Sequence, residues 1–256
     1  MKWTPAGLYR ASKDQLGSIR GIYLRSNRID AKRDFADFDD HVLLLHGFFQ
    51  TRRIFDIMED RLRADGFGCV SFDLGGLLGR YNARPTDDLA KLVGEKVDRL
   101  ATRHGVEALH VIGHSKGGLV ARRWVQHMGG LRRVKSVTTL GTPHHGTPTA
   151  LAGYALGLGT VSRNPRELLP NSPIVRALAR DTFPAHVPFT SIYSTSDLVC
   201  PWWCSVLRPR PGEETMENVE VHGLGHSELC WDPGVYGMVR ARLERADRLW
   251  KERRGE

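Results

Sequence analysis

The segment from Gly113 to Gly118 places a serine among glycines, with an apolar run before it and a helix-forming stretch after it. Leu109 to Ile112 has the composition of a buried strand, and Leu119 to Met128 predicts a helix that ends at Gly129-Gly130. A serine at the apex of a tight strand-to-helix turn needs strained backbone angles, and small neighbours let the backbones approach each other. This Gly-x-Ser-x-Gly pattern therefore predicts an exposed nucleophile, Ser115, above the edge of a sheet.

The chain on both sides of this turn alternates short apolar runs with amphipathic stretches. Continuous apolar runs are typical of strands buried on both faces, and their regular spacing with helices indicates βαβ units. We therefore predict an α/β fold, with a mostly parallel central sheet and helices on both of its faces. The predicted strands are 41–46, 67–74, 109–112, 134–140, 189–193 and a short one near 219–221, and the predicted helices are 54–62, 87–104, 119–128 and 236–251.

Residues 147–184 interrupt the alternation with an apolar segment that includes Leu151, Tyr154, Leu156 and Leu158. Such a segment could form a helical cap over an acyl pocket, or it could form ordinary core helices. No linker divides the chain, so we expect a single domain over residues 1–256 with 147–184 as a candidate cap or lid insertion. Residues 1–40 show no clear pattern: 21–24 could be a short strand or one helical turn, and 34–40 resembles an acidic loop.

Composition and charge exclude several classes of protein. A hydrophobic share of 41% in 256 residues supplies one sizeable core, which excludes a disordered chain. The net charge of +8 is spread over the chain in pairs such as Arg52-Arg53, which favours a solvated surface over a nucleic-acid footprint. Neither a signal peptide nor a transmembrane segment is visible, so we expect a cytoplasmic protein. Residues 236–250 predict a packed helix, and peripheral contact with a membrane surface is the alternative.

Two further segments extend the pattern around Ser115. Leu44 to Phe48 reads LLHGF after a predicted strand, and Gly141 to Gly146 reads GTPHHG after another. Together with the serine turn, these segments resemble the α/β-hydrolase family, particularly its bacterial lipases and esterases, over about residues 41–232. The resemblance implies that the backbone N–H of Phe48 binds an oxyanion. The N–H of Lys116 is the second candidate donor, because it lies at a helix N-terminus. We expect the Lys116 side chain itself to point into solvent.

A serine hydroxyl needs a nearby base to become a nucleophile, and the base needs a third group that orients it. In this fold the acid and then the histidine follow the serine in the chain. Asp197 follows the predicted strand 189–193, and His226 lies in a glycine-flanked loop after 219–221. The sequence therefore predicts a catalytic triad of Ser115, Asp197 and His226.

Other histidines and aspartates fit these roles less well. His222 ends a strand, where side chains pack more often than they catalyse, and His114 is expected to pack beside the serine turn. His144 and His145 are interpreted as loop residues at the border of the cleft. Three aspartates have the wrong position for the acid: Asp73 precedes the serine, Asp181 lies in the insertion, and Asp232 follows the histidine.

Cysteines and nucleotide motifs point to no cofactor. Cys69, Cys200, Cys204 and Cys230 are too scattered for a disulfide framework or a zinc site, so reduced thiols are expected. Cys204 and Cys230 are the pair that could join the acid loop to the histidine loop. Neither H-E-x-x-H nor a phosphate-binding glycine loop occurs, so the sequence predicts neither a metal nor a cofactor.

Apolar residues near the motifs suggest the substrate. Phe49, Leu151 and Trp202 are candidate substrate-binding residues, since aromatic and aliphatic side chains line acyl pockets. We expect a carboxylic ester hydrolase that forms an acyl-enzyme with a small-molecule or lipid ester. A thioesterase, an amidase, an acyltransferase and a binding protein that has lost catalysis are the alternatives.

Overall fold

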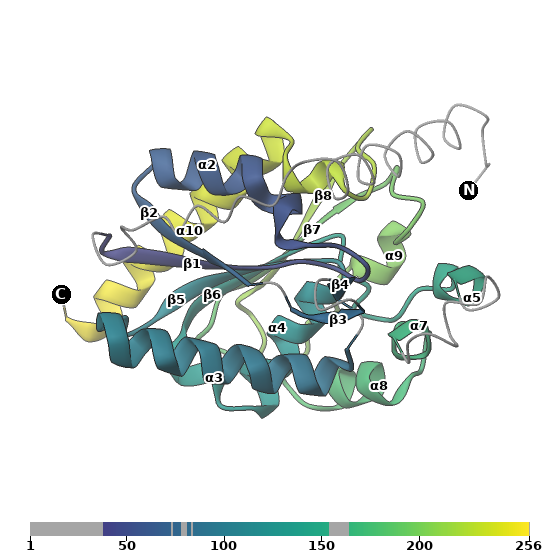
Figure 1. Ribbon diagram of the computed structural model, residues 1–256, viewed down its shortest axis with the longest axis horizontal. Helices are drawn as coiled ribbons and strands as arrows, with labels where there is room; N and C mark the ends of the chain where they lie inside the picture. Colours follow the sequence, from purple (N-terminus) through teal and green to yellow (C-terminus); the bar gives the residue numbers. More distant parts are fainter. Residues whose placement is uncertain (1–37, 73, 78–80, 83, 154–163, 256) are drawn as a thin grey trace.

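A six-stranded sheet runs through the centre of the molecule, and helices cover both of its faces (Figure 1). The computed structural model describes residues 38–72, 74–77, 81–82, 84–153 and 164–255. Within them the strand order is β2-β1-β5-β6-β7-β8, and every neighbouring pair is parallel. The strands are β1 (Asp40–Leu45), β2 (Phe67–Ser71), β5 (Leu109–His114), β6 (Val134–Leu140), β7 (Phe189–Ser194) and β8 (Met216–Val221). The predicted α/β fold is confirmed.

Strand β1 illustrates why its residues form an uninterrupted apolar run. Val42 and Leu44 pack in one core with α2 (Asp56–Ala64) and α10 (Pro233–Arg254). Leu43 and Leu45 point to the opposite face and pack in a second core with α3 (Thr86–His104) and α4 (Lys116–His127). All four side chains are fully buried, as expected of a parallel strand with helices on both sides.

Helix α4 begins earlier than the sequence indicated. Its first residue is Lys116, and the glycines at 117 and 118 form its first turn. A Cβ on Gly117 would lie 1.9 Å from the carbonyl oxygen of Leu45, and one on Gly118 would lie 2.1 Å from Oγ1 of Thr142. These glycines therefore allow α4 to start directly against the ends of the strands.

The described part of the insertion contains α5 (Thr149–Gly153), α7 (Asn164–Glu167) and α8 (Pro173–Arg180). Apolar residues of α8 and of the turn before it pack against Leu119 of α4, and Phe48 packs on the same cluster. The insertion thus contacts the two segments that carry the candidate oxyanion donors. Tyr154, Leu156 and Leu158 lie outside the described residues, as do residues 21–24 and most of the expected acidic loop at 34–40.

Short elements complete the fold: the 3-10 helices η2 (Arg52–Phe55), η3 (Gly130–Arg133) and η5 (Glu228–Cys230), the helix α9 (Trp202–Ser205), and the antiparallel pair β3 (Gly76–Leu77) and β4 (Tyr81–Asn82). The predicted strand 67–74 is three residues too long, because β2 already ends at Ser71. Among the helices described, none combines the length and the apolar character that a bilayer crossing needs.

Candidate active site

Ser115 occupies the bend between β5 and α4, at the carboxyl edge of the sheet. Its backbone has φ 52° and ψ −124°, a conformation that L-residues rarely adopt and that stores about 1–3 kcal/mol of strain. The N–H of Ser115 donates to the carbonyl of Leu140 over 2.9 Å, which fixes the bend to β6. A Cβ on Gly113 would lie 2.6 Å from backbone atoms of Gly118, so the glycine two residues before the serine is sterically required.

Asp197 and His226 meet at the same edge, after β7 and β8. Nδ1 of His226 lies 2.6 Å from Oδ2 of Asp197, and both side chains are buried. Oδ1 of Asp197 accepts the backbone N–H groups of Val199 and Cys200 over 2.8 and 2.7 Å. Because Asp197 accepts the Nδ1 proton, Nε2 of a neutral His226 carries the lone pair that a general base needs.

Gly141, at the end of β6, lies against this pair. Its φ is 55°, and a Cβ added there would stand 3.1 Å from both Oδ2 of Asp197 and Nδ1 of His226. A larger residue would therefore press on the hydrogen bond itself. This contact gives a physical reason for the first glycine of the GTPHHG segment.

His114 links the serine bend to the histidine loop. Its ring centroid lies 4.6 Å from that of His226, and its Nε2 is 3.1 Å from the backbone oxygen of His226. Nδ1 of His114 is 2.9 Å from Oε1 of Gln50, which also accepts the N–H of Gly47. Burial, reinforced by His226, holds the pKa of His114 well below its usual value, so the ring is neutral. A neutral ring carries one N–H, so it donates to only one of these two oxygens. The sequence predicted packing for His114, and it gave no sign of these hydrogen bonds.

The serine and the histidine are not hydrogen-bonded to each other. Within the described ranges, the side-chain hydroxyl of Ser115 forms no hydrogen bond, whereas Asp197 and His226 are in direct contact. His114, which directly precedes the serine, packs on the imidazole of His226, so the serine bend and the histidine loop lie side by side. Hydrogen bonds of this kind are often longer before substrate is bound.

The two candidate oxyanion donors flank the serine. A Cβ on Gly47 would lie 2.8 Å from Cβ of Ser115, so the loop that carries Phe48 touches the nucleophile. In the part of the chain that the structure describes, the N–H groups of Phe48 and Lys116 have no protein acceptor. These two N–H groups therefore stay the candidate donors to an oxyanion.

The side chain of Lys116 is buried, and the expectation that it points into solvent is wrong. Its Nζ donates to the backbone oxygen of Arg84 and lies 3.8 Å from Oε2 of Glu167 in α7. The same carboxylate oxygen accepts the N–H and the hydroxyl of Thr86 over 2.9 and 2.8 Å. Burial lowers the pKa of Lys116 to about 7, although Glu167 raises it. Lys116 therefore joins the serine bend, the start of α3 and the insertion.

The predicted substrate-binding residues lie on three segments of the chain. Phe49 is half-buried with its ring edge-to-face on Phe48, at a centroid distance of 5.2 Å. Leu151 in α5 is 59% exposed, and Trp202 in α9 is 40% exposed. Thr149 at the start of α5 donates to the carbonyl of Val199, which brings α5 next to the Asp197 loop. Leu151 and Trp202 are thus surface residues close in the chain to segments that meet at this loop.

His222, His144 and His145 have hydrogen-bond partners other than Asp197. His222 is exposed and 2.9 Å from the hydroxyl of Thr195, so its expected packing is wrong. His144 is fully buried, with Nε2 3.0 Å from the hydroxyl of Thr139. Nε2 of His145 donates to the carbonyl of Val206 over 2.8 Å. Both lie on the loop after Gly141, as expected.

The rejected acids have structural roles where they are described. Oδ2 of Asp181 lies 2.7 Å from Nε2 of His127, and Asp232 caps the N-terminus of α10 by accepting the N–H of Val235. Asp73 lies outside the described residues. All four cysteines are buried, and no disulfide joins Cys204 to Cys230 in the part of the chain that the structure describes.

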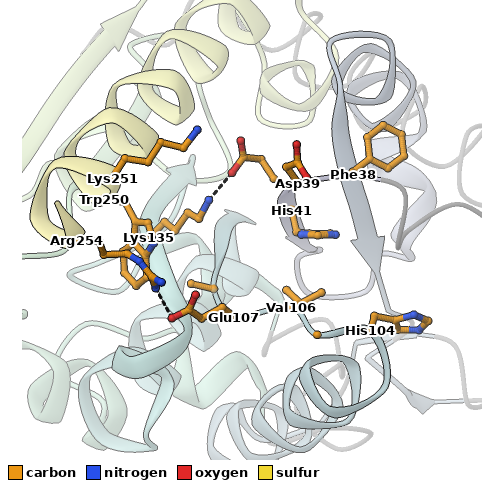
Figure 2. A pocket seen from close by; sticks show the side chains of 13 residues that line it. Phe38, Asp39, His41, His104, Val106, Glu107, Lys135, Trp250, Lys251 and Arg254 are labelled. Carbon is orange, nitrogen blue, oxygen red and sulfur yellow. Dashed lines mark hydrogen bonds and ion pairs between the residues drawn. The ribbon is translucent and has the colours of Figure 1, made fainter. Parts of the chain in front are cut away.

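A cavity at the opposite, amino-terminal edge of the strands has a volume of about 340 Å³ (Figure 2). Two pairs of its charged side chains are in contact: Lys135 with Asp40, and Arg254 with Glu107. None of the predicted triad lines it. Ligands of open α/β sheets bind at the carboxyl ends of the strands, so the edge that carries Ser115 is the candidate active site.

A sequence model of the family described as "alpha/beta hydrolase fold" matches residues 40–183, more than half of the chain. This chain belongs to the α/β-hydrolase family. Members of such a large fold family catalyse different reactions, so membership alone does not fix the bond that is cleaved.

Solved structures give the same fold at low sequence identity. Mature Bacillus licheniformis lipase BlEst2 has a TM-score of 0.66 at 14% identity, covering 80% of this chain and 91% of the lipase. A monoacylglycerol lipase of Paleococcus ferrophilus has a TM-score of 0.57 at 16% identity, covering 82% and 94%. A 2-hydroxy-6-oxo-6-phenylhexa-2,4-dienoate hydrolase of Rhodococcus sp. strain RHA1 has a TM-score of 0.56 at 18% identity, covering 82% and 92%.

Proposed function

We propose that this α/β-hydrolase family member is a serine hydrolase that cleaves carboxylic esters with apolar acyl groups through an acyl-enzyme. The observation that carries the proposal is the buried 2.6 Å hydrogen bond between Asp197 and His226, at the edge where Ser115 forms its strained bend. A buried carboxylate that accepts an imidazole proton and two backbone N–H groups favours the His226 tautomer that can act as a base.

The reaction begins when Oγ of Ser115 attacks the ester carbonyl carbon and Nε2 of His226 takes its proton. The carbonyl oxygen becomes an oxyanion, which the N–H groups of Phe48 and Lys116 stabilise by about 3–4 kcal/mol each. When the intermediate collapses, the C–O bond to the alcohol breaks and His226 returns the proton to the alcohol. Water then attacks the acyl-enzyme with His226 as base, and the carboxylic acid leaves Ser115.

The ester and the apolar acyl group are proposed from the surroundings of the site. Phe49, Leu151 and Trp202 supply aromatic and aliphatic surface near the Ser115 and Asp197 loops, and apolar acyl chains bind such surface. Two structural neighbours are lipases by name, which supports an ester over other carbonyl substrates. A lipid ester could reach these residues by peripheral contact with a membrane surface. The cytoplasmic location stays a prediction from the sequence.

A fluorophosphonate probe and a series of p-nitrophenyl esters of increasing acyl length test the proposal. We expect the probe to label the wild-type chain but not Ser115→Ala, and we expect that variant to lose esterase turnover. In Asp197→Asn, we expect the probe still to label Ser115, but slowly, and kcat to fall by about 10⁴-fold, because the wrong imidazole tautomer then faces the serine. Thr102→Ala, an exposed change on α3, serves as the control. An unchanged rate in Ser115→Ala would remove the proposal.

Matched thioester and amide substrates, and an added alcohol as acyl acceptor, separate ester hydrolysis from the other reactions that the same triad could perform. A rate advantage for the ester with water as acceptor is the expected result. A thioester or amide that reacts faster in kcat/KM would change the substrate class and keep the roles of Ser115 and His226.

A further inference from the structure

A second cavity, of about 320 Å³, lies between α4, α8, the loop that carries His144 and His145, and the segment 207–216. None of Ser115, Asp197 or His226 lines it. The proposed reaction leaves both histidines of the GTPHHG segment without a role, and both belong to the wall of this cavity. Its volume is at the small end of the range typical of ligand sites, ~300–1,000 Å³.

The charged residues of the wall do not balance. Three arginines, Arg122, Arg208 and Arg210, face a single carboxylate, Glu213. Glu213 is buried and already saturated: it accepts the N–H of Phe183 over 2.6 Å, the N–H of Arg210 over 2.8 Å, and the Arg210 guanidinium over 3.3 Å. Glu213 therefore balances the charge of Arg210, and the charges of Arg122 and Arg208 stay unbalanced in this wall.

Arg122 is buried and bonds only to neutral oxygens. Its Nε donates to Gln126 over 2.9 Å and its Nη2 to the carbonyl of Leu178 over 2.7 Å. Burial lowers the pKa of Arg122 to about 10, although Glu213 raises it from a distance. Within the described ranges neither Arg122 nor Arg208 forms an ion pair. A buried cation without an anionic partner is costly, and a bound anion would offset that cost.

His144 supplies a second, independent observation. Its Nδ1 is buried and has no hydrogen-bond partner, while Nε2 lies 3.0 Å from the hydroxyl of Thr139. Burial and then the charge of Arg122 hold the pKa of His144 well below its usual value, so the ring adds no charge. Buried polar atoms in proteins normally have partners, so an unpartnered one at a cavity wall points to a missing ligand or water.

We propose that this cavity binds a small organic carboxylate, with its carboxyl group at Arg122 and Arg208 and its apolar part against Ala179, Leu207 and Met216. Guanidinium groups match the planar carboxylate in shape and charge, and Nη1 of Arg122 is not used by the bonds described above. The apolar wall favours an organic acid over inorganic phosphate. The site does not depend on the reactivity of Ser115.

The cavity in Figure 2 provides the contrast. Three basic side chains, Lys135, Lys251 and Arg254, line it together with three carboxylates, Asp39, Asp40 and Glu107 (Figure 2). Lys135 is paired with Asp40 and Asp247, and Arg254 is paired with Glu107. Where carboxylates match the basic side chains in number, no added anion is needed to balance the charge. A basic wall alone therefore does not mark an anion site in this chain, whereas the uncompensated wall at Arg122 and Arg208 does.

Isothermal titration and thermal denaturation with sodium butyrate test the proposal, with sodium phosphate and sodium chloride at equal ionic strength as the comparison anions. We expect saturable butyrate binding and a raised Tm in wild type and in Ser115→Ala alike. Arg208→Ala, an exposed change, should weaken binding about tenfold or more, because it removes a charged partner of the carboxylate. Arg248→Ala, exposed on α10, is the matched control.

Equal butyrate affinity in Arg208→Ala and wild type would overturn the proposal, as would the absence of saturable binding. Loss of binding in Ser115→Ala would place the butyrate in the candidate active site and would also overturn it. Tighter binding of phosphate than of butyrate would exclude the carboxylate assignment. Because the readout is binding, an inactive Ser115 would leave these outcomes unchanged, so the two proposals fail separately.

Discussion

Lys116 directly follows the candidate nucleophile in the chain. Its buried ammonium group donates to the backbone oxygen of Arg84 and lies 3.8 Å from the carboxylate of Glu167. Its partners Arg84 and Glu167 lie 32 and 51 positions away in the chain, so no local pattern could reveal them. The positions of Ser115, Asp197 and His226 at one edge of the sheet were predictable because they depend on chain order and on strand ends. The contacts of His114, Gln50 and Lys116 were not, because they depend on tertiary packing.

Lys116→Met tests whether this burial is a net cost. The folded-state pKa of about 7 lies below the unfolded value of about 10.4, so the folded chain binds fewer protons between them and its stability rises with pH. We expect the variant to be more stable than wild type by about 1–4 kcal/mol at and below pH 7. The advantage should shrink toward pH 10.

Urea denaturation at pH 6, 8 and 10 measures this difference, with the exposed Lys91→Met of α3 as control. A variant that is less stable than wild type at pH 6 would show that the bonds to Arg84 and Glu167 outweigh the desolvation of the charge.

At the scale of elements, most strands were predictable, whereas the edge strand β8 was predicted only in part. β1, β5 and β6 are buried along nearly their whole length, and β1 is an almost continuous apolar run. β5 and β6 also contain buried polar residues, such as His110, Ser136 and Thr138. β8 (Met216–Val221) mixes apolar with polar residues, and all of its residues except Val221 are partly or fully exposed. Only its last three residues were predicted. An edge strand with one neighbour buries less surface, and its sequence is correspondingly less apolar. The short helices of the insertion could not be predicted from local periodicity, because their apolar residues pack against Leu119 of α4, which is far away in the sequence.

Gly141→Ala tests the loop that supports the acid and the histidine. The added Cβ would stand 3.1 Å from both partners of the hydrogen bond, so we expect kcat to fall by about 10–100-fold with a smaller change in KM. Gly105→Ala is the matched control, since it has a similar φ of 67° with nothing within 4 Å of its Cβ. Equal kcat values for the two variants would contradict the steric argument.

At the scale of the whole molecule, a buried polar network joins the helix α10 to the sheet. Nε2 of His110 in β5 and Nζ of Lys135 in β6 lie 3.1 and 2.8 Å from Oδ1 of Asp247. Burial opposes ionisation, but His110 and Lys135 together hold the pKa of Asp247 well below its usual value. The network lies at the edge opposite to the candidate active site, so its role is in stability.

Asp247→Asn should destabilise the fold by about 3 kcal/mol at pH 7, because it leaves Lys135 with fewer partners. The lowered folded-state pKa means that the carboxylate's contribution is complete above its unfolded pKa of about 3.9 and is lost as the pH falls further. Urea denaturation at pH 7, 5 and 3 should therefore show that the difference in free energy of unfolding between Asp247→Asn and wild type becomes smaller only at pH 3. Glu244→Gln, an exposed change on α10, should cost less than about 1 kcal/mol at each pH.

Ser115 and His226, the candidate nucleophile and base, follow strands that differ in how many neighbouring strands support them. Ser115 follows β5, which has a neighbour on each side, whereas His226 follows β8, which has only β7 beside it in the described sheet. Outer strands open at lower free energy than inner ones. On heating, we expect β8 and the His226 loop to open while the bend at Ser115 is still folded. Esterase turnover should therefore be lost several degrees below the temperature at which the circular dichroism signal of the helices declines.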